Sequence, residues 1–160
     1  MLIGVMSDTH DNLTNIRSAI EIFNHCNVSM VLHAGDFTSC FTFRALNDLK
    51  ADFCGIFGNN DRDLLSLDEV SKEKIYRQPY DFVIGQKRFV MIHEHFHVRT
   101  LAQSGRYDFL IYGHTHKPKV EQIAQTIVLN PGETAGWLHG NPTVALLDII
   151  TAETHFINIK

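Results

Sequence analysis

Five short segments of this sequence carry side chains of the kinds that bind divalent metal ions, and each follows a run of apolar residues. Their donors are carboxylate and amide oxygens and imidazole nitrogens, with no thiolate among them. This donor set suits manganese, iron, zinc or nickel rather than an iron–sulfur centre. The segments are Asp8-Thr9-His10, Gly35-Asp36, Gly58-Asn59-Asn60-Asp61, His93-Glu94-His95 and Gly113-His114-Thr115-His116.

Each segment taken alone has an ordinary structural explanation. The run Asp8–His10 fits a turn or a helix cap, and the alternation over His93–His97 fits a half-exposed strand. The run Gly113–His116 is the most suggestive, because two imidazoles two residues apart on an extended segment can hold one metal ion or two adjacent ones. The five segments together favour a shared metal site, since all of them lie at predicted strand ends.

Alternating strands and helices in the first half of the chain would position these segments. Apolar runs predict strands over Leu2–Ser7, Met30–His33 and Ala51–Phe57. A helix is predicted with Asn12 or Thr14 as its cap, and another over Phe41–Leu49. Strands separated by helices are parallel neighbours, and their carboxyl ends meet along one edge of a sheet, where ligands bind.

The second half is richer in strands and turn signals. A hairpin is predicted around Gly85-Gln86, and a closing antiparallel pair near the end of the chain. Parallel strands followed by hairpins indicate one α/β domain over residues 1–160, with a mixed sheet or two sheets packed face to face. The predicted strands are Asp81–Ile84, Lys87–His93, Phe109–Tyr112, Lys119–Ala124, Thr126–Leu129, Thr143–Ile150 and Thr154–Ile159.

Composition narrows the classes of function. The chain is 44% hydrophobic and 20% charged, as globular domains are, and its net charge of -4 gives no support to a role on nucleic acid or at a membrane surface. No secretory signal opens the sequence, and no apolar run reaches the roughly 18 residues of a spanning helix. Three cysteines without a CxxC pair favour a reduced, cytoplasmic compartment.

The ordered motifs resemble those of the calcineurin-like metallophosphoesterases: Asp-x-His, Gly-Asp, Gly-Asn-x-Asp, His and Gly-His-x-His. The chain length and the turn Asn130-Pro131-Gly132 resemble the small prokaryotic YfcE-type phosphodiesterases. The resemblance runs from Met1 to about Ile150. It implies a four-layer α/β/β/α sandwich of two mixed sheets flanked by helices, and metal-dependent hydrolysis of a small phosphate ester, a phosphodiester above all.

The same resemblance implies two divalent metal ions, manganese first and iron, zinc or nickel as alternatives, with a hydroxide bridging the two ions as the nucleophile. It implies catalytic roles for Asp36, Asn59 and His95. Seven residues are implied as ligands: Asp8, His10 and His116 on one ion, Asn59, His93 and His114 on the other, and Asp36 between them.

Two departures bear on the chemistry. Many larger relatives carry a histidine after the motif asparagine, where it is thought to protonate the leaving group, and this chain has Asn60. His95 is the nearest candidate to replace it, or it contacts the phosphate. Glu94 stands where small relatives have glycine; we expect it to point to solvent, with a contact to a neighbouring histidine as the alternative.

Several residues near the motifs have simpler interpretations. Asp61 is expected to fix its own turn, and Arg62 to flank the site where it could contact phosphate. Lys117 is expected on the solvated surface. Trp137 and Leu138 are expected in local core or an interface rather than in contact with substrate.

Two other functions stay open. One is a non-catalytic binding subunit on the same fold, as the small retromer subunit is, although here every ligand position is filled. The other is a nuclease, against which the acidic balance and the missing motif histidine count. The sequence leaves a homo-oligomeric state open and gives no sign of a membrane partner.

Overall fold

Strands and helices alternate in the first half of the chain and build the first of two sheets in the computed structural model, which describes residues 1–160. The strand order is β11-β10-β1-β2-β3-β4. Strands β1 to β4 are parallel neighbours, while β10 runs antiparallel to both β1 and β11. The bounds are β1 Leu2–Met6, β2 Met30–His33, β3 Asp52–Ile56, β4 Ile75–Tyr76, β10 Thr143–Asp148 and β11 Thr154–Asn158.

The second sheet comes from the middle of the chain, in the order β5-β6-β7-β9-β8. Two antiparallel hairpins, β5–β6 and β8–β9, flank the parallel pairs β6–β7 and β7–β9. Both sheets are therefore mixed. The bounds are β5 Tyr80–Ile84, β6 Lys87–Met91, β7 Phe109–Ile111, β8 Lys119–Ile123 and β9 Thr126–Asn130.

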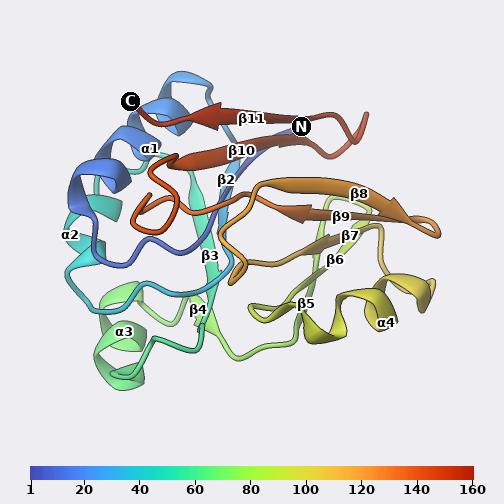
Figure 1. The fold of residues 1–160 in the computed structure, drawn as a ribbon, viewed down its shortest axis with the longest axis horizontal. Helices are drawn as coiled ribbons and strands as arrows, with labels where there is room; N and C mark the ends of the chain where they lie inside the picture. Colours follow the sequence, from blue (N-terminus) through green and yellow to red (C-terminus); the bar gives the residue numbers. More distant parts are fainter.

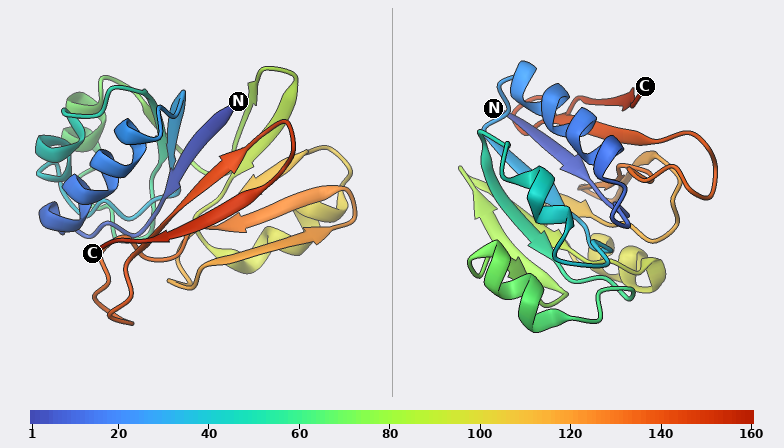
Figure 2. Two further views of the ribbon diagram at one scale, coloured as in Figure 1. Left: turned by 90° about the horizontal axis from the view of Figure 1, so that it is seen from above. Right: turned by 90° about the vertical axis from the view of Figure 1, so that its left-hand side faces the viewer.

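Helices cover the outer faces of both sheets (Figure 1). Figure 2 shows α1, α2 and α3 on one side of the molecule and α4 on the other. The Asn12 side chain accepts a hydrogen bond from the Asn15 amide at 3.3 Å and so caps α1. The helices are α1 Leu13–His25, α2 Thr42–Leu46, α3 Leu64–Ser71 and α4 Val98–Gln103, and a 3₁₀ turn, η1, spans His95–His97. None is long and apolar enough to cross a membrane.

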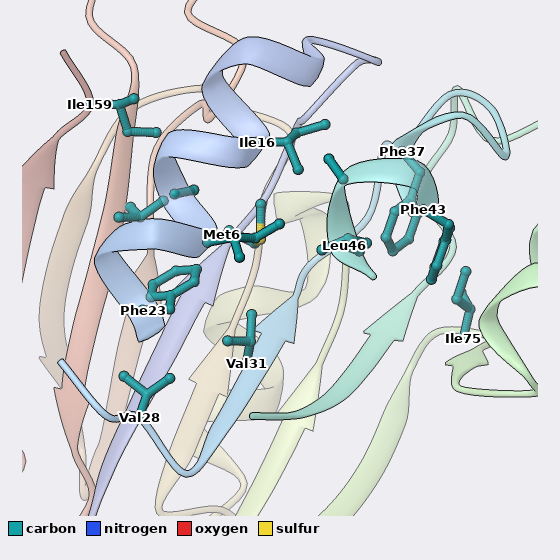
Figure 3. Close-up of a cluster of buried hydrophobic side chains, with 14 of the residues drawn as sticks. Met6, Ile16, Phe23, Val28, Val31, Phe37, Phe43, Leu46, Ile75 and Ile159 are labelled. Atoms are coloured by element: carbon teal, nitrogen blue, oxygen red, sulfur yellow. The ribbon is translucent and has the colours of Figure 1, made fainter. Parts of the chain in front are cut away.

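Three buried apolar clusters separate four layers. The first packs α1 and α2 onto the first sheet and includes Phe23 and Phe37 (Figure 3). The second lies between the sheets and includes Leu32 and Phe89. The third joins the second sheet to α4. The expected α/β/β/α sandwich is confirmed.

Two local expectations were wrong, and some elements were missed. The second helix stops at Leu46, because the Asn24 side chain binds the chain beyond it, accepting from the Lys50 amide and donating to the Asp48 carbonyl, both at 2.9 Å. Strand β6 ends at Met91, so His93–His97 is not a strand. Helices α3 and α4 and strand β4 were not predicted.

Candidate metal centre

All five motif segments meet at one edge of the two sheets, just beyond the carboxyl ends of β1, β2, β3, β6 and β7. The backbone there is unusual, because φ is positive at five of the seven implied ligands. The values are 53° at Asp8, 39° at His10, 63° at Asp36, 65° at His114 and 59° at His116. A left-handed non-glycine residue costs about 1–3 kcal/mol, and such residues cluster at functional sites. The surrounding fold therefore holds these loops in a left-handed backbone conformation that non-glycine residues locally disfavour.

The first donor group surrounds Asp8, which is fully buried. Its Oδ1 lies 3.4 Å from His116 Nε2 and 3.9 Å from His10 Nε2, and the two imidazole rings stack with centroids 5.5 Å apart. The Ser7 hydroxyl donates to Asp8 Oδ2 at 2.6 Å and the His114 amide at 3.1 Å. These bonds fix the carboxylate beside both histidines.

The second donor group centres on the Asn59 side-chain oxygen. Its Oδ1 lies 2.9 Å from His93 Nε2 and 2.9 Å from His114 Nδ1. His93 Nδ1 donates to the Ala34 carbonyl at 2.7 Å, which orients the ring. The amide oxygen and the two imidazoles thus converge, as the ligands of one cation would.

Asp36 lies between the two groups. Its Oδ2 is 3.7 Å from His10 Nε2 in the first group and 3.4 Å from His93 Nε2 in the second. Asn60 holds the carboxylate in place with two bonds, donating from its backbone amide to Oδ1 at 2.9 Å and from its side chain to Oδ2 at 2.7 Å. Asp36 is placed to contact cations in both groups.

Asp61 ties the loop after β2 to the loop after β3. Its Oδ2 accepts from the amides of Gly58 at 2.8 Å and Asp36 at 3.0 Å, and its Oδ1 accepts from the Thr38 amide at 2.7 Å. It fixes its own turn, as expected, and also the backbone that carries Asp36. Burial raises the pKa of the Asp61 carboxyl group, and these amide bonds oppose that shift.

The buried charges of the site are coupled. Burial raises the pKa of Asp8. Burial acts the same way on Asp36, but bonds from His93 and Asn60 outweigh it and hold its pKa below the usual range. Burial disfavours a charged His93, yet its bond and charge interaction with Asp36 raise its pKa to about 9. Burial lowers the pKa of His114. Without a bound cation, this shift favours a charged His93 ring beside the Asp36 carboxylate.

The donors fit divalent cations. The ligand atoms of Asp8, His10 and His116 lie within 4.8 Å of one another, and so do those of Asp8, Asp36 and His93. They are carboxylate oxygens and imidazole nitrogens, the donors of manganese, iron, zinc and nickel sites.

Two motif glycines keep this centre open. A Cβ at Gly58 would collide with the Asp36 carboxylate, and one at Gly113 would lie 2.9 Å from Asp8 Oδ2. The backbone at both positions must therefore approach the carboxylates closely, which only glycine allows.

The other residues of the His93–His97 segment lie outside both donor groups. His95 is exposed on η1, and its ring stacks on that of His114 with centroids 5.7 Å apart. His97 is exposed as well. Glu94 is half-buried and lines a hollow beside Phe96 rather than standing free in solvent. His33 was given no role; it is buried, pairs with the Thr9 hydroxyl at 3.0 Å, and its pKa is lowered by burial to about 3.

Sequence reasoning missed Glu133, a buried residue directly after the Asn-Pro-Gly turn. Its Oε2 lies 3.3 Å from His116 Nδ1, a buried nitrogen that has no aligned hydrogen-bond partner. Its Oε1 accepts from the Trp137 amide at 2.7 Å and the Leu138 amide at 3.2 Å. An acidic residue after a turn signal was the one available clue.

Of the two places expected for Trp137 and Leu138, local core is wrong, and an interface stays a prediction. Their exposed fractions are 66% and 68%, and they line a hollow of about 660 Å³ beside the first donor group. Arg62 lines the same hollow, whereas Lys117 is exposed and is not one of the residues that line it. The turn carries these side chains outward because Glu133 binds its backbone from inside.

Comparison with known proteins gives consistent matches. The model of the calcineurin-like phosphoesterase superfamily domain matches residues 1–152. Phosphodiesterase MJ0936 of Methanocaldococcus jannaschii is 42% identical over 154 residues, which cover 92% of this chain and 93% of that protein. A solved archaeal phosphodiesterase superimposes with a TM-score of 0.94 at 41% identity, covering 99% of each chain. Zinc-bound Vps29 from Entamoeba histolytica shares the fold, with a TM-score of 0.72 at 18% identity and 100% of each chain covered.

Proposed function

The chain belongs to the calcineurin-like phosphoesterase superfamily and is a phosphoesterase, and from this we propose that it hydrolyses small phosphodiesters with two divalent metal ions. The motif resemblance to this superfamily is thereby confirmed. The observation that carries the proposal is the position of Asp36 between two donor groups that gather from five strand ends. The diester preference rests on the relative named a phosphodiesterase at 42% identity.

Each side chain has a part in the proposed reaction. Asp8, His10 and His116 would hold one cation, Asn59, His93 and His114 the other, and Asp36 both. Cations bound there would lower the pKa of a shared water molecule, so that hydroxide forms near neutral pH and attacks phosphorus, and would neutralise phosphoryl charge.

Two features of the chain itself shape that reaction. The Asn59 oxygen can ligate without adding negative charge, which favours an anionic substrate. The Asn60 side-chain amide donates a hydrogen bond to Asp36, so it positions the carboxylate rather than assisting the leaving group. His95, exposed beside His114, remains the candidate for that assistance.

We propose manganese as the first metal, with iron, zinc and nickel as alternatives, because metal availability decides among cations that such donors bind. The proposal includes a cytoplasmic location, which the unpaired Cys26, Cys40 and Cys54 support. A binding subunit without chemistry is less well supported, because each of the seven ligand positions holds a donor. The net charge of -4 does not favour a nuclease.

The test combines metal content with hydrolysis of bis(p-nitrophenyl) phosphate. We expect two metal ions per chain, loss of hydrolysis on chelation and its return with Mn²⁺. Asp36→Asn should remove nearly all turnover, because both donor groups use that carboxylate, and His93→Ala should be severely impaired. The matched control His97→Ala lies on the same segment and should change little. A chain that binds no metal at micromolar concentration would favour the binding subunit instead.

A further inference from the structure

Two large apolar side chains stand in solvent at the rim of the metal centre. Trp137 and Leu138 are neighbours on a turn and have exposed fractions of 66% and 68%. A tryptophan usually hides most of its large surface, which is why an exposed one beside a polar site is informative. Nothing in the chain covers this pair.

Several hydrogen bonds stabilise the turn that carries them. Glu133, buried beneath it, accepts hydrogen bonds from both of their amides. The Gly140 amide donates to the Gly136 carbonyl at 3.0 Å, and the Trp137 indole nitrogen reaches the His10 carbonyl at 3.5 Å. These bonds fix the backbone of the turn and place the indole beside the His10 backbone.

The hollow next to it has a mixed lining. Its polar residues include His10, Asn60, His116 and Glu133, and its apolar residues are Trp137 and Leu138. Arg62 is the one lysine or arginine that lines it. Its volume of about 660 Å³ falls in the range of small-molecule sites, roughly 300–1,000 Å³.

We propose that this hollow is a subsite for a planar aromatic ester arm, a nucleobase or an aryl group, of a phosphodiester whose phosphate lies at the metal centre. An indole face and a guanidinium group both attract aromatic rings, the first by stacking and the second through its charge. An alkyl arm would gain little from either. A long nucleic-acid strand does not fit, because it needs a basic groove and successive stacking residues, and this chain has a net charge of -4 and one tryptophan.

The subsite extends the proposed function and depends on it, but the binding test does not require catalysis. Trp137 is the sole tryptophan, so fluorescence excited at wavelengths that the four tyrosines do not absorb reports on this hollow. Metal-loaded protein is titrated with AMP and with ribose 5-phosphate, with excitation at wavelengths where adenine does not absorb. The two probes share the sugar phosphate and differ in the base. We expect saturable quenching by AMP, and binding of ribose 5-phosphate at least about tenfold weaker, the order of one base stack.

Variants separate the subsite from a general surface effect. Leu138→Ala should weaken AMP binding several-fold, while the control Leu65→Ala, at a leucine 84% exposed on α3, should leave it unchanged. Equal affinities for the two probes, or equal effects of the two variants, would overturn the subsite.

A kinetic comparison gives the second measurement. The two substrates are thymidine 5′-(p-nitrophenyl phosphate) and methyl p-nitrophenyl phosphate, which share a leaving group and differ in the retained arm. We expect wild type to prefer the thymidine ester by about tenfold or more in kcat/KM, Trp137→Ala to lose that preference, and Trp137→Phe to keep part of it. Hydrolysis of both esters without preference would reject the subsite and leave the phosphoesterase intact. If neither ester is hydrolysed and no metal binds, the proposed function fails, and the same AMP titration of the protein without metal then decides the subsite by itself.

Discussion

Loading the metal-free centre with a divalent cation should release a proton from His93. Its ring is buried, with Nε2 3.4 Å from Asp36 Oδ2 and Nδ1 donating to the Ala34 carbonyl. Although burial opposes the charge, Asp36 raises the pKa of His93 to about 9. An imidazole must be neutral to ligate a metal, so the cation has to displace that proton.

The size of the effect follows from the pKa. Near pH 7.5 a histidine with a pKa of about 9 is almost fully protonated, so loading should release about one proton from it, whereas an unperturbed histidine would release about a tenth. His114 differs, since burial lowers its pKa and leaves the ring neutral in the metal-free protein. The two imidazole ligands of this donor group should therefore release different numbers of protons when the metal binds.

Calorimetric titration with Mn²⁺ in buffers of different ionisation enthalpy measures the protons released. His93→Asn should release about one proton fewer than wild type, and His114→Asn should release as many as wild type. Both variants lose one imidazole of the same group, so a proton lost by bound water contributes alike to both. An equal loss in the two variants, or no loss in His93→Asn, would refute the ion pair.

Three further outcomes are expected. The folded pKa of His93 is raised from 6.5 to about 9, so its contribution to the stability of the metal-free protein is complete below pH 6.5 and lost as pH rises through about 9. Thermal unfolding of wild type should show this decline in stability. A decline of the same size in His93→Asn would contradict it. Glu133→Gln should weaken metal binding about 10–100-fold, because the carboxylate beside His116 is lost, and a titration showing less than a twofold change would rule that role out. For a series of phenyl esters, kcat/KM should fall steeply as leaving-group pKa rises, because Asn60 stands where a general acid would act. A general acid is typically worth about 10²–10⁴-fold. A flat dependence in wild type that becomes steep in His95→Ala would identify His95 as the acid.

The placement of the site could be predicted because parallel topology brings strand ends together. The runs before Asp8, Asp36 and Asn59 were strong enough to predict as strands, so the convergence of their polar residues followed from the sheet alone. Motif order supplied the rest of the ligand set through the resemblance. Both inferences combine local sequence patterns with the known topology of parallel sheets.

The features that were missed depend on long-range contacts. Helix α2 stops early because Asn24, on another helix, binds the chain beyond it. Glu133 was missed because its partner His116 is distant in the sequence, and because its bond to the nearby Trp137 amide leaves no recognisable sequence pattern. The exposure of Trp137 follows from that same buried carboxylate, and no hydrophobic pattern records it.

The coupling of His93 to Asp36 also offsets the repulsion between the buried carboxylates of the centre. Asp8 and Asp36 are both buried, and two carboxylates so placed repel each other unless a positive charge lies nearby. The protonated His93 ring supplies that charge, while Asn60 and Asp61 fix the carboxylate and the backbone of Asp36. The bond from the Asp36 amide to Asp61 also holds the Asp36 backbone at its positive φ of 63°. On the proposed function, a cation bound beside Asp36 would replace the proton of His93 as the neighbouring positive charge.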